Sequence, residues 1–132
     1  DTNFSSQISL FQKLMRLFSK NASVIFMSSI SGQRGSYDPV YSASKAAQIG
    51  FIKSIALWEG SKIRINGIAP SLVENSSMFD EMAAKRQKYH ISQSPTSKLT
   101  SKKELARIVF DISGESWSNV NGQIISVNGG IL

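Results

Sequence analysis

The chain has 132 residues, of which 41% are hydrophobic and 18% are charged, a composition typical of one globular unit. It contains no cysteine and one histidine, which excludes a disulfide framework, a cysteine nucleophile and a histidine-rich metal cluster. No apolar run is long enough to span a bilayer, and the first residues lack the pattern of a secretion signal. We therefore expect a cytoplasmic protein that binds neither a membrane nor a metal.

The formal net charge of +6 raises the question of a nucleic-acid partner. No nucleic-acid fold signature is present, and aromatic and basic residues are not interleaved, so we predict that most of these charges lie on solvated helix faces. His90 is expected to be a surface residue. An acidic substrate, linked to a carrier protein or to a nucleotide, is equally consistent with the charge.

The first part of the chain predicts a helix followed by a buried strand. Asn21 is the expected stop of the helix, and Val24 to Met27 form an apolar run that ends at Ser28 and Ser29. Ligands bind at the carboxyl ends of such strands, so these two serines are candidate site residues. The helix itself is predicted from apolar residues at three- and four-residue spacing: Phe4, Ile8, Phe11, Met15 and Phe18.

A second helix is predicted to begin at Asp38 and Pro39, because aspartate favours the N-cap and proline the first helical position. It should run to about Trp58, with Gly60 as a left-handed terminator. Phe11, Met15 and Trp58 are more simply core or dimer contacts than a cofactor pocket.

The second part of the chain predicts two more strands and two more helices. Strands are expected at 63–68 and 123–127, a charged helical lid at 74–89, and a turn at 113–121. A capping box at 101–104 opens the last helix, whose apolar face is Leu105, Ile108, Val109 and Ile112. Three apolar strands separated by four helices predict an α/β fold with a doubly wound parallel sheet.

Tyr41 and Lys45 stand four residues apart on the second predicted helix, so their side chains share one face. An ammonium beside a phenol oxygen stabilises the phenolate, which suits the phenol to general acid/base catalysis near neutral pH. A serine hydroxyl nearby would hold and polarise a substrate oxygen. The pair alone is also compatible with an ordinary exposed helix face. Its neighbouring segments favour carbonyl/alcohol redox chemistry.

These segments are Asp1 to Ser6, Ser29 to Gly32, the proline after the second strand, and Gly122 to Gly130. Together with Tyr41 and Lys45 they resemble the short-chain dehydrogenase/reductase family, especially its 3-oxoacyl-carrier-protein-reductase-like members, along nearly the whole chain. The resemblance implies that Tyr41 is the general acid/base and that Lys45 tunes it and holds the nicotinamide ribose. It also implies that Ser29 binds the substrate oxygen and that Asn3 anchors a proton-relaying water.

The catalytic serine has two candidates. Counting back from Tyr41 by the family's usual interval selects Ser28, whereas the spacing to Gly32 selects Ser29. We prefer Ser29, because a loop such as 33–38 readily absorbs a deletion.

The cofactor implied by the resemblance is NAD or NADP. Pro70, Ser71, Val73 and Asn75 occupy positions similar to the family's nicotinamide contacts, and no metal is implied. Ser71 stands where the family commonly has glycine, and serine disfavours a positive φ.

The chain has no glycine-rich strand-to-helix turn for a pyrophosphate. We therefore expect residues 1–132 to be the C-terminal half of one Rossmann-type domain, inactive and marginally stable alone. The resemblance also implies a small-molecule carbonyl or alcohol substrate and a homo-oligomer formed through the helices at 4–18 and 40–58. The rival hypothesis is a non-catalytic interaction remnant of the family that binds no cofactor.

Overall fold

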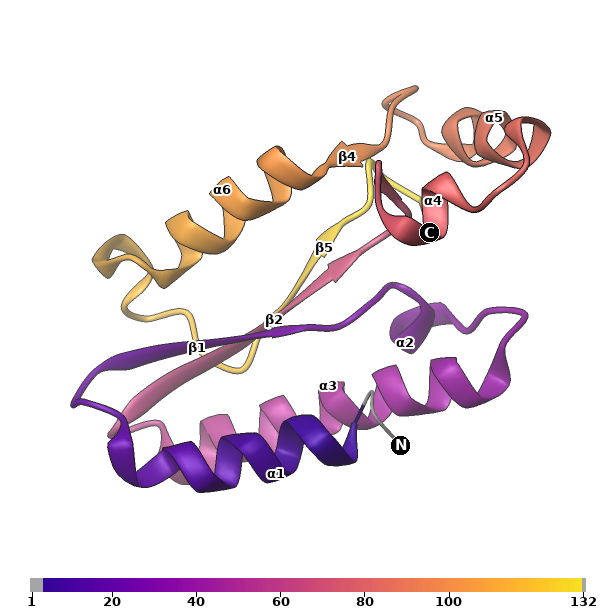
Figure 1. Ribbon diagram of the computed structural model, residues 1–132. Coiled ribbons are helices and arrows are strands. Elements are labelled where there is room, and N and C mark those ends of the chain that lie inside the picture. Colours follow the sequence, from indigo (N-terminus) through magenta and orange to yellow (C-terminus); the bar gives the residue numbers. More distant parts are fainter. Residues whose placement is uncertain (1–3, 132) are drawn as a thin grey trace.

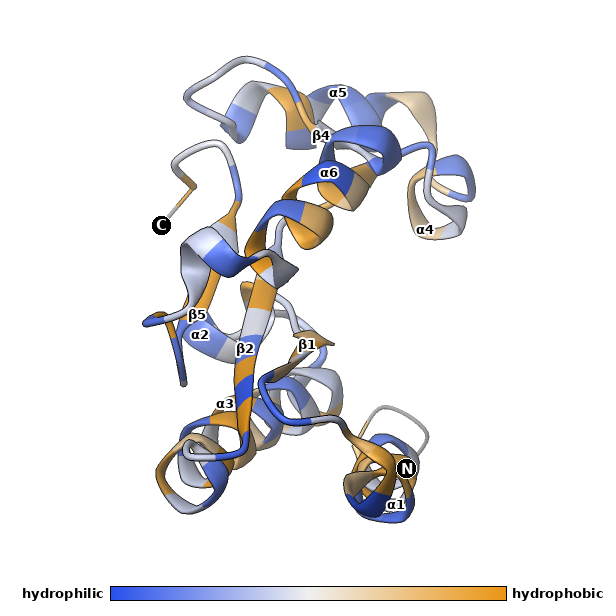
Figure 2. Ribbon diagram, turned by 90° about the vertical axis from the view of Figure 1, so that its left-hand side faces the viewer, coloured by the Kyte–Doolittle hydropathy of each residue, from blue (hydrophilic) through white to orange (hydrophobic). Residues whose placement is uncertain are grey.

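A computed structural model describes residues 4–131 and arranges them in three layers (Figure 1). The central layer is a parallel sheet of β1 (Ala22–Met27), β2 (Ile63–Pro70) and β5 (Ile124–Val127), in the order β1-β2-β5. Helices α1 (Ser5–Leu14) and α3 (Pro39–Glu59) cover one face, and α6 (Lys102–Ser113) covers the other (Figure 2). The predicted α/β class and its parallel sheet are confirmed.

The strand register brings the carboxyl ends of all three strands to one side of the sheet. Met27 pairs with Ile68 at the end of β1, and Pro70 pairs with Val127 at the end of β5. The central strand β2 is the most buried of the three, with Ile65 and Ile68 fully inaccessible. The polar residues that follow the strands are therefore gathered at this carboxyl edge, where ligands bind in open parallel sheets.

The main core lies between the sheet and the layer formed by α1 and α3. Four phenylalanine rings from these elements have centroids 5.4 to 6.1 Å apart in tilted or edge-to-face pairs. They are Phe11, Phe18, Phe26 and Phe51. Phe11 is thus a core residue, with Met15 packed against the same cluster, whereas Trp58 is 81% exposed.

A buried asparagine on β2 fixes the start of β5. The Asn66 side-chain amide donates to the Val120 carbonyl at 2.8 Å, and its oxygen accepts from the Gln123 amide at 2.9 Å. Asn121 completes the clamp, because its side-chain oxygen accepts from the Ile65 amide at 2.8 Å. Both the nitrogen and the oxygen of the buried Asn66 side chain are therefore hydrogen-bonded to backbone groups.

Arg64 ties the end of α6 to β2. Its guanidinium donates to the carbonyls of Ile112, Ser113 and Gly114 at 3.3 to 3.5 Å, and to that of Val120. The last carbonyls of a helix have no partner within the helix and carry partial negative charge, so a guanidinium there stabilises the helix end. This contact holds α6 against the sheet.

Both predicted helix starts are confirmed. The Asp38 carboxylate accepts from the Tyr41 amide at 2.9 Å, and the Ser101 hydroxyl accepts from the Glu104 amide at 3.1 Å. The prediction for Gly60 is wrong, because this residue has φ −60° and ψ −19° in the right-handed region. The chain turns toward β2 through a bond from the Lys62 amide to the Glu59 carbonyl instead, so no positive φ is needed there.

The segment predicted as a charged lid contains two helices, α4 (Ser77–Asp80) and α5 (Ala84–Gln93), which lie on the side of the carboxyl edge (Figure 1). A pairing that the sequence did not predict brackets it: β3 (Val73–Glu74) runs parallel to β4 (Thr100–Ser101). Strands of two residues carry no periodic signal. Short helices also occur at α2 (Ser31–Arg34), η1 (Met15–Leu17) and η2 (Glu115–Trp117), the last inside the predicted turn.

Between residues 4 and 131, no helix combines the length and the hydrophobicity that crossing a bilayer requires.

Replacing Ile65 with alanine should lower the free energy of unfolding by about 2–5 kcal/mol, because it empties a fully buried site on the central strand. Ile65→Val removes one methylene and should cost only about 0.5–1.5 kcal/mol. Urea titration followed by circular dichroism measures both changes. Equal and small losses would show that the site is not part of a close-packed core.

Candidate functional site

Lys45 lies at the centre of the carboxyl edge. Its side chain is buried between α3 and the end of β1, and the residue is 7% exposed. The ammonium Nζ donates to the Met27 carbonyl at 2.9 Å, while the Ser28 hydroxyl donates back to the Lys45 carbonyl at 3.3 Å. Burial lowers the pKa of Lys45 below its ordinary value of 10.5, because leaving water disfavours the charged amine.

Tyr41 is held beside Lys45 by the start of α3. Asp38 caps the helix through the Tyr41 amide, which fixes the backbone from which the ring projects. The Lys45 Nζ lies 5.7 Å from the centroid of the half-buried Tyr41 ring, within the range of a cation–π contact. The structure therefore brings together the two side chains that the i, i+4 spacing placed on one face.

The two candidate serines have different partners. Both are buried, but the Ser28 hydroxyl is used as a donor to the backbone of α3. The Ser29 hydroxyl instead accepts from the Ser31 amide at 3.1 Å, so its own hydrogen has no acceptor among the described residues. Of the two hydroxyls, that of Ser29 can donate its hydrogen to a substrate oxygen.

Gly32 allows α2 to lie directly on α3 at Lys45. A Cβ built on Gly32 would stand 2.6 Å from the Lys45 carbonyl carbon and 2.9 Å from the Ala46 amide nitrogen, both backbone atoms. No side chain fits between the two helices at this point. The Ser29-to-Gly32 spacing is thus a packing requirement of the site.

The predicted cofactor contacts lie along the same edge. The Ile30 amide donates to the Pro70 carbonyl at 3.1 Å, and the Ser71 amide donates to the Val127 carbonyl at 3.1 Å. Ser71 is absent from the residues with positive φ, so serine is compatible with the backbone path there. Val73 lies in β3, and Asn75 adopts φ 57°, a conformation that asparagine tolerates. Asn3 lies outside the described residues.

His90 lies on α5 and is half-buried, whereas the sequence analysis placed it on the surface without a partner. Burial lowers the pKa of His90 below 6.5, and the nearby guanidiniums of Arg86 and Arg34 lower it further. Arg34 ends α2, and Arg86 lies one turn before His90 on α5. The basic composition of α5 was visible in the sequence, but the partial burial of His90 was not.

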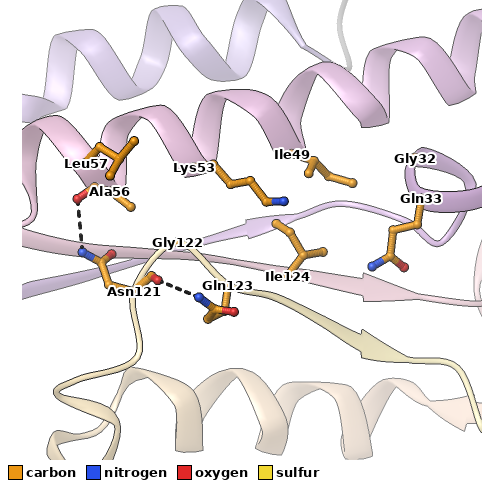
Figure 3. A pocket seen from close by; sticks show the side chains of 10 residues that line it. All are labelled: Gly32, Gln33, Ile49, Lys53, Ala56, Leu57, Asn121, Gly122, Gln123 and Ile124. Carbon is orange, nitrogen blue, oxygen red and sulfur yellow. Dashed lines mark hydrogen bonds between the residues drawn. The ribbon is translucent and has the colours of Figure 1, made fainter.

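An open groove of about 900 Å³ lies along the other side of α3 (Figure 3). Lys53 and Ile49 of α3 face Gln123 and Ile124 across it. None of the predicted site residues lines this groove. Among the described residues, no three histidines or carboxylates come together as a metal site.

Comparisons with known proteins identify the family of this chain. A family model described as enoyl-(acyl carrier protein) reductase matches residues 1–132. The chain belongs to the short-chain dehydrogenase/reductase family. A 3-oxoacyl-[acyl-carrier-protein] reductase FabG from Buchnera aphidicola of Acyrthosiphon pisum is 33% identical across 98% of this chain and 54% of that protein. The FabG of Thermotoga maritima is 30% identical across 86% of this chain and 46% of that protein.

Solved structures of the family share the fold. A short-chain dehydrogenase/reductase (glucose/ribitol dehydrogenase) from Brucella melitensis superposes with a TM-score of 0.92 at 26% identity, over 98% of this chain and 53% of that one. The angucycline C-6 ketoreductase LanV, crystallised with bound NADP, gives a TM-score of 0.89 at 22% identity, over 98% of this chain and 51% of that one. The chain spans about half the length of the relatives that it matches.

Gly32→Ala should lower the free energy of unfolding by about 1–3 kcal/mol, because the added methyl group meets the backbone of α3 at Lys45. The matched control is Ser31→Ala in the same short helix, which adds no atom to that contact and should change stability by less than about 0.5 kcal/mol. Chemical denaturation measures both variants. If the two lose equal stability, α2 and α3 are not in contact at Gly32.

Arg86→Gln should raise the pKa of His90 toward 6.5, because it removes one of the two positive charges that disfavour the imidazolium. His90 is the single histidine among these 132 residues, so its ring signals can be followed by NMR across a pH titration. The control is Arg16→Gln on η1, which should leave the pKa of His90 unchanged. An unchanged value in Arg86→Gln would place that guanidinium away from the ring.

Proposed function

We propose that this chain supplies the catalytic half of an NAD(P)-dependent oxidoreductase that interconverts a carbonyl and a secondary alcohol. The observation that carries the proposal is the grouping of the Tyr41 ring, the buried Lys45 amine and the Ser29 hydroxyl at the carboxyl edge of the sheet. Membership of the short-chain family supports it. The substrate is a small molecule in this proposal.

Each residue has a distinct role. The Ser29 hydroxyl donates a hydrogen bond to the substrate oxygen, since the Ser31 amide occupies one of its lone pairs and leaves its hydrogen to be donated. The Tyr41 hydroxyl gives a proton to that oxygen during reduction and takes one from the alcohol during oxidation. Lys45 stabilises the phenolate that remains. Because burial lowers its own pKa, the Lys45 amine also passes on a proton more readily than an exposed lysine.

The nicotinamide cofactor fits the donors that are present. An ammonium has three N–H donors, and Lys45 uses one of them on the Met27 carbonyl, which leaves two for ribose hydroxyls. Pro70, Ser71, Val73 and Asn75 are the proposed contacts of the nicotinamide ring and its carboxamide. When bound, the nicotinamide donates or accepts the hydride at its C4 carbon. Asn3 is the proposed anchor of a water that relays protons to Lys45.

We further propose that the pyrophosphate-binding turn of the same Rossmann domain is contributed by residues outside this chain. β1 pairs on one side with β2 and has no strand on its other side among the described residues. The 132 residues alone are therefore proposed to be inactive, and the choice between NAD and NADP to be made outside them. The proposed compartment is the cytoplasm.

A homo-oligomer is proposed through the outer faces of α1 and α3. Large apolar side chains are exposed along both helices, which is typical of a surface that a second copy covers. They are Leu10, Leu14, Leu17, Val40, Leu57 and Trp58, with exposed fractions from 37% to 84%.

The rival proposal is a non-catalytic module that dimerises through the same helices and binds no cofactor. Calorimetric titration with NADH and NADPH, on this chain and on the native-length polypeptide that carries it, separates the two. Binding by neither form would favour the rival. The presence of Ser29, Tyr41 and Lys45 at the carboxyl edge of the sheet favours the enzyme.

Tyr41→Phe in the native-length polypeptide should lower kcat by about 10²- to 10⁴-fold, because the proton donor is lost while the ring remains. Cofactor affinity should change by less than about twofold. The control is Tyr37→Phe, since Tyr37 is fully exposed four residues earlier and should retain full activity. Turnover is followed by nicotinamide absorbance, and full activity in Tyr41→Phe would remove this residue from its proposed role.

A further inference from the structure

Two glutamines join α1 to α3 in the interior of the protein. The side-chain amide of Gln48 donates a hydrogen bond to the side-chain oxygen of Gln7 at 2.6 Å, across 41 positions of the sequence. Gln48 is fully buried, and Gln7 is half-buried. Both helices run back along one face of the sheet from the side of its carboxyl edge (Figure 1). We refer to Gln7 and Gln48 as the glutamine bridge.

The glutamine bridge lies between the candidate site and the main core. The buried residues of α3 include Lys45, Gln48 and Ile52, whose spacings of three and four residues place them on one face of the helix. Ile52 belongs to the same core cluster as Phe11, which follows Gln7 by one turn on α1. The bridge therefore occupies the turn of α3 between the buried amine and the apolar core.

Stability alone does not account for two amides at this position. Both lose water on folding, and the hydrogen bond between them does little more than offset that cost. Apolar side chains of the same size would fill the space beside Ile52 without desolvating any polar group. A buried polar pair next to a site is expected where it fixes a geometry that function requires.

Each glutamine is close in sequence to a member of the proposed proton relay. Gln48 follows Lys45 by three residues on α3. Gln7 follows Asn3, the proposed anchor of the relaying water, by four residues. We propose that Gln48 is a positioning residue, which holds the start of α1 at the turn of α3 that carries Lys45, so that one water spans the distance from Asn3 to Lys45. The inference rests on the proposed function, since it concerns the proton supply of the same site.

The glutamine bridge should affect one step of the proposed reaction. During reduction the Tyr41 hydroxyl gives a proton to the substrate oxygen, and the relay returns a proton from solvent through the water and Lys45. A displaced α1 interrupts this return. It leaves Tyr41 and Lys45 in place, because β1 and α3 are fastened to each other by separate hydrogen bonds. The return of the proton should therefore slow, while the binding of substrate and cofactor should change little.

The first test measures turnover in the native-length polypeptide with Gln7→Leu and Gln48→Leu together. Leucine is similar in volume to glutamine, and removing both amides leaves neither of them facing an apolar partner. In dilute buffer kcat should fall about three- to tenfold, with less than about a twofold change in KM for substrate and cofactor. Imidazole carries protons without the relay, so raising its concentration should restore kcat.

The matched control is Gln12→Leu, the same replacement on the exposed face of α1, which should change neither kcat nor its dependence on imidazole. An unchanged kcat in the Gln7→Leu, Gln48→Leu variant would overturn the inference while leaving the proposed function intact. A loss of kcat that imidazole does not restore would show a structural role and would overturn it equally.

The second test asks whether Gln48 acts through Asn3. Asn3→Ala removes the proposed anchor and should reproduce the loss of kcat and its restoration by imidazole. Adding Gln48→Leu to Asn3→Ala should cause no further loss, because both changes interrupt one relay. Losses that multiply would separate the two residues and contradict the inference. If the unsubstituted native-length protein turns over no carbonyl and no alcohol, the proposed function fails first and the inference falls with it.

The third test does not depend on turnover. Gln48→Leu alone should lower the urea midpoint more than Gln7→Leu with Gln48→Leu, because the single change leaves the Gln7 amide against a leucine. Equal midpoints in the two variants would show that the amides are not partners, which would overturn the inference whatever the activity. The single variant also serves for the turnover measurements if the double variant does not fold.

Discussion

The site depends on the way in which the end of β1 is fastened to α3. Lys45 donates from its side chain to the Met27 carbonyl, and Ser28 donates from its side chain to the Lys45 carbonyl, so strand and helix are joined in both directions. Gly32 lets α2 close over the same point. These contacts fix Ser29 and Tyr41 relative to each other, because Ser29 directly follows Ser28 and Tyr41 lies one helical turn before Lys45.

Contacts of β2 and β5 support this junction of β1 and α3 from the other side of the sheet. Asn66 and Arg64 on β2 organise the approach to β5 and the end of α6, and β5 in turn presents its last residues to Ser71 and to Gln33. A polar residue inside a sheet lowers stability unless its partners are all in place. Here the partners are backbone groups of loops. The polar side chains of β2 therefore hold the loops at both edges of the sheet in place.

The elements that the sequence predicted are those whose signals are local. Asp38 and Ser101 predicted helix starts, because a cap involves only the next three residues. The strands β1 and β2 could be predicted from their own apolar runs alone. Gly60 was misassigned, because the direction in which the chain leaves α3 is set by the position of β2. The β3–β4 pair depends on contacts between residues more than twenty positions apart, which no local pattern encodes.

Two arrangements in this chain reduce stability, and both lie at the carboxyl edge. Burial lowers the pKa of Lys45 in the folded state, which opposes folding. This penalty is full below the lowered pKa and fades as pH rises from it toward the unfolded value near 10.5. Burial, followed by the charges of Arg86 and Arg34, lowers the pKa of His90, and this opposes folding as pH falls below 6.5. Ribose hydroxyls and a phenolate, the partners proposed for Lys45, would offset the cost at that residue. Groups such as Lys45 and His90, which lower stability, are expected where a sequence is shaped by binding rather than by stability alone.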